Sequence, residues 1–165
     1  MNVKKMTTLA ISVALAMIFS FIESQIPPLV AIPGVKIGLA NIVTLFLIYT
    51  LGELPAAGVS LVRVVLSSLL FSSPVSMIYA LSGAVLSFVT ITLLKRFTPF
   101  SVVGVSVAGA VLHNVGQIIA AAFVLGAAEI VYYLPVLIIS GTIAGVGVGL
   151  ISGFLIKRLA PIINK

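Results

Sequence analysis

The chain lacks two residue types on which much protein chemistry depends, because it contains no cysteine and no aspartate. Without cysteine it forms neither disulfides nor thiolate metal sites. Without aspartate it has no aspartate-rich site for a magnesium–diphosphate complex. It also has no Gly-x-x-x-x-Gly-Lys-Ser/Thr loop, so it does not bind ATP in that known way. We therefore expect no catalysis by this chain alone, no metal site and no resident cofactor.

Charge is scarce as well. Charged residues make up 7% of the 165 residues and hydrophobic residues 61%, with a mean hydropathy of +1.37. This composition excludes a soluble domain and is typical of a polytopic membrane protein. Lys4 and Lys5 resemble the start of a signal peptide, but no small-residue cleavage site follows them. We therefore predict an all-α membrane protein in which residues 1–165 form a single integral membrane domain.

Long apolar segments define the expected helices. About 20 helical residues span a hydrocarbon core of roughly 30 Å. Proline- and glycine-containing turns separate the segments, and the second segment is short. The pattern predicts a bundle of six transmembrane helices at residues 6–22, 37–51, 55–71, 75–94, 100–125 and 130–156.

The basic residues indicate the orientation, because cytoplasmic loops carry an excess of lysine and arginine. With six crossings and a cytoplasmic N-terminus, the C-terminus is cytoplasmic too. Only Lys36 then lies outside, and Arg63 lies within the membrane. All the other basic residues are cytoplasmic: Lys4, Lys5, Lys95, Arg96, Lys157, Arg158 and Lys165.

Several polar residues lie inside these apolar segments, where they are costly and usually face a bundle interior or a cavity. His113 and Gln117 are four residues apart and share a helical face, and Asn114 is three residues from Gln117. The alternative is a network that holds helices together, at typically about 0.6 kcal/mol for each contact. The predicted substrate-binding residues are Lys36, Asn41, Arg63, His113, Asn114 and Gln117.

Arg63 carries most of this prediction, since a central arginine costs roughly 2.5–3.5 kcal/mol on insertion scales. The sequence places no acidic residue at its depth, and Glu53 lies at the cytoplasmic end of the preceding helix. An unpaired guanidinium suits a carboxylate or a phosphate. His113 is open to two interpretations, a satisfied core histidine or a proton relay. The outer loop from Glu23 to Lys36 is either a lid or a simple connector.

Small residues at four-residue spacing allow helices to approach closely. The last helix carries such a stripe, and it either packs inside the bundle or docks against a partner. We expect the partner-docking face on the first helix, at Ala10 and Ala14. The stripe of the last helix is Gly141, Gly145, Gly149 and Gly153.

Three stretches carry a family resemblance: residues 33–41, which read Pro-Gly-Val-Lys-Ile-Gly-Leu-Ala-Asn, then Arg63, then residues 109–117, which read Gly-Ala-Val-Leu-His-Asn-Val-Gly-Gln. Together they resemble small bacterial membrane proteins called Gx transporters or heptaprenyl diphosphate synthase component I. Those proteins are in turn similar to the substrate-binding subunits of energy-coupling-factor transporters. The resemblance implies six helices, a ligand site near the outer face, toppling in the plasma membrane and a coupling surface on helix one.

The two family labels imply different functions. The transporter label implies uptake of a small anionic or polar molecule, such as a quinone or isoprenoid precursor or a flavin-like cofactor. It also implies a membrane coupling subunit and cytoplasmic ATPases supplied by other chains, with no nucleic acid. The synthase label implies a non-catalytic accessory subunit in prenyl diphosphate or quinone synthesis, or in an electron-transfer assembly. A third hypothesis is a solo carrier that uses a proton through His113.

Overall fold

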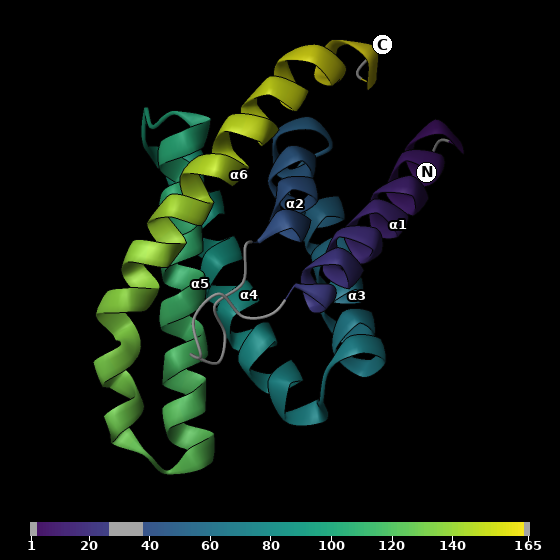
Figure 1. Cartoon of the computed structure of the whole chain (residues 1–165). Coiled ribbons are helices and arrows are strands. Elements are labelled where there is room, and N and C mark those ends of the chain that lie inside the picture. Colours follow the sequence, from purple (N-terminus) through teal and green to yellow (C-terminus); the bar gives the residue numbers. More distant parts are fainter. Residues whose placement is uncertain (1–2, 27–37, 164–165) are drawn as a thin grey trace.

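The computed structural model describes residues 3–26 and 38–163, and all regular structure in these ranges is helical (Figure 1). The prediction of an all-α protein is confirmed. The elements are α1 (Val3–Gln25), α2 (Leu39–Thr50), α3 (Glu53–Phe71), α4 (Pro74–Phe97), α5 (Val102–Leu125), the 3-10 helix η1 (Ala128–Tyr133) and α6 (Leu134–Ile163).

Five of the described helices are long and apolar enough to cross a membrane, which makes the chain a multi-pass membrane protein. The sixth, α2, has 12 residues and is about 18 Å long, so it is shorter than a hydrocarbon core. Successive helices alternate in direction, and α1 begins at the same end of the bundle at which α6 finishes (Figure 1). The six-helix bundle predicted from the sequence therefore contains one short, mostly buried helix.

Most helix boundaries differ from the predicted ones by a few residues, and the following differences matter most. Helix α1 continues through Gln25, so the prediction that a loop begins at Glu23 is wrong. The first strong helix breaker after it in the sequence is Pro27, and residues before a proline disfavour the helical region. Helix α6 runs through Pro161 to Ile163 instead of ending at residue 156. The last helix was predicted to begin at residue 130, but α6 begins at Leu134, and the 3-10 helix η1 occupies Ala128–Tyr133 after the left-handed Gly126.

Basic side chains gather where α1 begins and α6 ends. Lys4 Nζ donates to the carbonyl oxygen of Ile162 at 3.4 Å, and Lys95 Nζ donates to that of Ile48 at 2.6 Å. Arg96 forms an ion pair with Glu53 at 3.3 Å. The pair occupies Glu53 at this end and leaves it unsuited to neutralise Arg63. The observed clustering agrees with the charge separation predicted from the sequence, although Lys36 and Lys165 lie outside the described residues.

The glycine stripe of α6 packs against α5. A methyl group on Gly145 would lie 2.7 Å from Val107 Cα, and one on Gly149 would lie 2.7 Å from Val103 Cα. One on Gly141 would lie 2.8 Å from the side-chain nitrogen of Asn114. These distances are too short for any side chain, so only glycine permits this approach. For these three glycines the open question about the stripe is answered in favour of packing inside the bundle, whereas a methyl group on Gly153 would lie 4.0 Å from Val102 Cβ, an ordinary contact.

Helix α5 approaches α4 equally closely on its other side. A methyl group on Gly83 of α4 would lie 2.7 Å from the carbonyl oxygen of His113, and one on Gly116 of α5 would lie 2.8 Å from that of Ser82. Helices α4, α5 and α6 thus form a tightly packed group. This packing fixes the position of the polar face of α5.

Helix α1 turns Ser12, Ala16 and Ser20 into the bundle and leaves Ala10 and Ala14 exposed. In a membrane, such a face of small residues contacts either lipid or another helix. The placement of Ala10 and Ala14 is compatible with the predicted docking face, which stays a prediction.

Lys95 is expected to stabilise the C-terminal end of α2. Its ammonium group donates to the carbonyl oxygen of Ile48 and lies 5.1 Å from the ring centroid of Tyr49. A cation at this end also interacts favourably with the helix dipole. We expect Lys95→Met to lower the free energy of unfolding by about 1 kcal/mol. Thermal unfolding in detergent measures this, with Lys157→Met as the control; equal stability of the two variants would contradict the assignment.

Candidate substrate-binding site

Arg63 projects from the middle of α3 into the bundle. Its Nη2 donates to Asn41 Oδ1 of α2 at 3.0 Å. Its Nε is buried and has no hydrogen-bond partner among the described residues. A buried N–H without a partner is unfavourable, so this guanidinium retains a donor for another group. The two predicted residues Asn41 and Arg63 therefore lie in direct contact.

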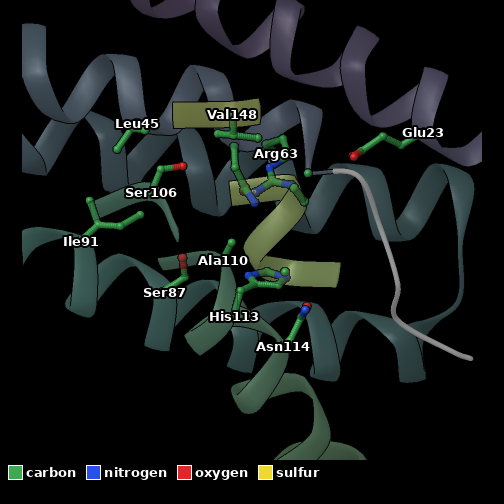
Figure 2. A pocket seen from close by; sticks show the side chains of 14 residues that line it. Glu23, Leu45, Arg63, Ser87, Ile91, Ser106, Ala110, His113, Asn114 and Val148 are labelled. Atoms are coloured by element: carbon green, nitrogen blue, oxygen red, sulfur yellow. Dashed lines mark hydrogen bonds between the residues drawn. The ribbon is translucent and has the colours of Figure 1, made fainter. Parts of the chain in front are cut away.

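Arg63 and His113 together line three neighbouring cavities. The first, here called the central cavity, has a volume of about 60 Å³. In Figure 2 Arg63 and His113 point into the same space, and Glu23 approaches from α1. The described lining of the central cavity is Glu23, Gly38, Asn41, Leu45, Arg63, Ser87, Ile91, Ser106, Ala110, His113, Asn114, Gly141, Ala144 and Val148.

The second cavity, here called the serine cavity, also has a volume of about 60 Å³. It lies on another side of Arg63, between α1, α3, α4 and α5. A third cavity of about 20 Å³ adjoins Arg63, Asn41 and Ser60. The described lining of the serine cavity is Ser20, Glu23, Ser24, Arg63, Val64, Ser67, Ser68, Phe71, Ser72, Ser76, Ala80, His113 and Gln117.

Glu23 is a candidate site residue that the sequence analysis placed in the outer loop. It lines both the central and the serine cavity, together with Arg63. Its Oε1 accepts a hydrogen bond of 2.8 Å from the backbone N–H of Leu39, in the first turn of α2. The expectation that no acidic residue approaches Arg63 in depth is therefore wrong. The cause is the extra turn of α1, which carries Glu23 into the bundle instead of into a loop.

The predicted polar residues Asn114 and Gln117 of α5 contact different helices in the structure. Asn114 is buried, and its Nδ2 donates to the carbonyl oxygen of Leu137 in α6 at 2.7 Å. It therefore joins α5 to α6 while it also lines the central cavity. Of the three cavities described, Gln117 lines the serine cavity, where it lies next to Gly83 of α4. Lys36, predicted as a site residue, lies outside the described residues.

We expect Asn114→Leu to lower the free energy of unfolding by about 1 kcal/mol, because it removes an interhelical hydrogen bond in a buried environment. Gln117→Leu, on the same helix, is the comparison, and thermal unfolding in detergent measures both. If Asn114→Leu unfolds at the wild-type temperature, the hydrogen bond to Leu137 is not structural and Asn114 is free to serve the ligand.

The sequence analysis did not predict the serine cavity, although the spacing of small residues in α1 and α3 indicates it. Ser12, Ala16 and Ser20 recur every fourth position of α1 and are buried. Ser60, Val64 and Ser68 do the same on α3. Four-residue spacing of small residues predicts a buried face, and hydroxyls on such a face predict either close helix contact or a polar cavity.

A comparison with models of known protein families identifies the family of the chain. The family model of heptaprenyl diphosphate synthase component I matches residues 12–155. The chain belongs to this family. The matched region begins in α1 and ends in α6, so it contains every cavity-lining residue named above. No curated protein and no solved structure matches the chain.

Proposed function

We propose that this protein is the membrane-embedded substrate-binding subunit of an energy-coupling-factor-type uptake transporter in a bacterial plasma membrane, with both termini in the cytoplasm. The observation that carries the proposal is Arg63, whose buried Nε lacks a partner among the described residues and which lines three cavities with His113. A charged side chain at that depth in the membrane is energetically costly, and such residues usually have a functional role. An anionic or strongly polar group of a small organic substrate satisfies it.

The chemistry of the site favours binding over catalysis. The charged side chains of the central cavity are Arg63 and Glu23, and Glu23 already accepts a hydrogen bond from the start of α2. Asn41 orients the guanidinium from the opposite helix. This arrangement recognises and orients a polar group, and we propose that the chain performs no reaction on it.

Helix α2 is the element that links the site to the cytoplasmic end. Glu23 of α1 holds its first turn, and Lys95 of α4 holds its last turn. Two cavities of about 60 Å³ each are small beside the roughly 300 Å³ of ordinary ligand pockets. A cofactor-sized substrate therefore requires α1 or α2 to move away from Arg63. That movement provides a route by which binding is sensed at the cytoplasmic side.

A transporter of this type needs partners. We propose that a membrane coupling subunit docks against Ala10 and Ala14, which are exposed on α1, and that cytoplasmic ATPases supply the energy. The chain itself has no phosphate-binding loop for ATP. The word "component" in the family name agrees with a protein that functions together with other subunits.

The same family name favours a second candidate function, a non-catalytic membrane subunit of a prenyl diphosphate synthase. In that case the partner is a synthase, and the polar site around Arg63 has no substrate to bind. The complete lack of aspartate requires the catalytic diphosphate site to lie on another chain.

Proteoliposomes distinguish these functions. We expect the purified chain alone to bind its substrate without accumulating it under a pH gradient, and accumulation to begin only when the co-purified partners and ATP are present. Accumulation by the chain alone would instead establish a proton-driven carrier. Normal prenyl diphosphate synthesis that depends on the chain but not on Arg63 would establish the synthase subunit.

A further inference from the structure

The serine cavity differs in chemistry from the central cavity. Six serines line it, contributed by α1, α3, the turn after α3, and α4. Gln117 and His113 of α5 complete its polar wall. The central cavity instead presents the aliphatic side chains of Leu45, Ile91 and Val148 beside its polar groups. Arg63 and His113 are common to both cavities, so the two spaces adjoin at this pair.

Two donors of the serine cavity lack partners within the described part of the chain. Ser20 is 8% exposed, and its Oγ makes no hydrogen bond to a described residue. Arg63 Nε is also buried and makes no hydrogen bond to a described residue. Buried polar groups are nearly always satisfied, and an unsatisfied one marks the place of a water, an ion or a ligand. Both atoms belong to residues that line the same cavity, which indicates that an occupant completes it.

The polar groups of the lining restrict what this occupant is. Arg63 and Glu23, which have opposite signs, line both cavities, so the six serines and Gln117 are what distinguish the serine cavity. A hydroxyl group both donates and accepts, so it pairs with serine hydroxyls, with an amide and with either charge. The volume of about 60 Å³ corresponds to roughly four water molecules, which is the scale of a short polyol chain.

We propose that the serine cavity is a second compartment of the substrate site and holds an uncharged, hydroxyl-rich arm of the substrate. The less polar part of the same molecule enters the central cavity, and Arg63 contacts the substrate where the two parts join. This inference rests on the proposed function, since it names the class of substrate: an amphipathic molecule with a polyhydroxyl arm.

Ser20→Ala tests the proposal, with Ser12→Ala as the matched control. Both serines are buried on the same face of α1, two turns apart, but only Ser20 lines the cavity. The probe is glycerol, titrated against the full-length protein in lipid nanodiscs and followed by saturation-transfer NMR. We expect saturable binding to the wild type and to Ser12→Ala, and binding about fivefold weaker to Ser20→Ala, as for the loss of one hydrogen bond.

Three results with the probe would overturn the proposal: no saturable glycerol binding to the wild type, equal binding to both serine variants, or displacement of glycerol by inorganic phosphate at lower concentration than glycerol itself requires. Thermal unfolding separates a folding defect from a binding defect, because removal of the unpaired Ser20 hydroxyl is expected not to lower the unfolding temperature. A natural substrate that Ser20→Ala retains as well as the wild type, but that an Arg63 variant loses, would end this inference and leave the proposed function standing.

Discussion

Replacement of Arg63 by methionine is expected to weaken substrate binding about a hundredfold while the bundle stays folded. The guanidinium supplies charge-assisted hydrogen bonds, each worth roughly 1.5–3 kcal/mol, and a bidentate contact adds geometric specificity. A loss of about 2.8 kcal/mol corresponds to a hundredfold change in the dissociation constant. Equilibrium dialysis of the radiolabelled substrate against protein in nanodiscs measures it.

The stability of the Arg63→Met variant is part of the same prediction. Methionine is unbranched, shorter than arginine and uncharged, so it removes the cost of a buried cation while Asn41 loses one donor. We expect the free energy of unfolding to change by no more than about 1 kcal/mol. Arg96→Met removes an exposed arginine from the ion pair with Glu53 and is the control for binding. A folded Arg63→Met variant that binds like the wild type would show that Arg63 only holds α2 and α3 together.

The second large effect is expected at Gly145, where alanine should destabilise the protein by about 2 kcal/mol. The added methyl group would lie 2.7 Å from Val107 Cα and 3.1 Å from Ala110 Cβ. The nearest of these atoms belongs to the backbone of α5, so relief requires the two helices to separate. Such separation also shifts Asn114 and His113 relative to α6, and substrate binding is expected to weaken with stability.

Gly147 offers a matched control on the same helix. A methyl group there meets no atom within 4 Å, so Gly147→Ala is expected to be neutral or to stabilise α6 by up to about 1 kcal/mol. Thermal unfolding in detergent compares the two variants. Equal unfolding temperatures would contradict the account of α5–α6 packing, and a lower temperature for Gly147→Ala would place the contact on the wrong face of α6.

The fold was largely predictable because hydropathy and charge act over whole segments. Each spanning helix was located from its apolar run, and the basic ends of α4 and α6 were assigned to one side of the bundle. The wrong predictions concerned single residues and helix ends. Glu23 is polar and lies close to prolines, which favoured a loop, yet α1 absorbs it and delivers its carboxylate to the first turn of α2.

Some of the residues that line the cavities were predictable from the sequence, but their arrangement was not. The cost of a charge in lipid identified Arg63, and the structure indeed joins it to Asn41. No sequence rule, however, distinguishes the task of Asn114 from that of Gln117, since both lie on the polar side of α5. Their separation depends on which neighbour each meets, α6 for Asn114 and α4 for Gln117. The glycine stripe was ambiguous for the same reason, because small residues pack equally well against a neighbour in the chain or a partner.

The measurement that tests the central claim most directly is native mass spectrometry of the gently purified protein, wild type beside Arg63→Met. The account predicts one small organic molecule bound per wild-type chain, with a polar or anionic group, and none bound to the folded variant. The same molecule bound at equal occupancy to both proteins would contradict the assignment of Arg63 as the centre of the binding site.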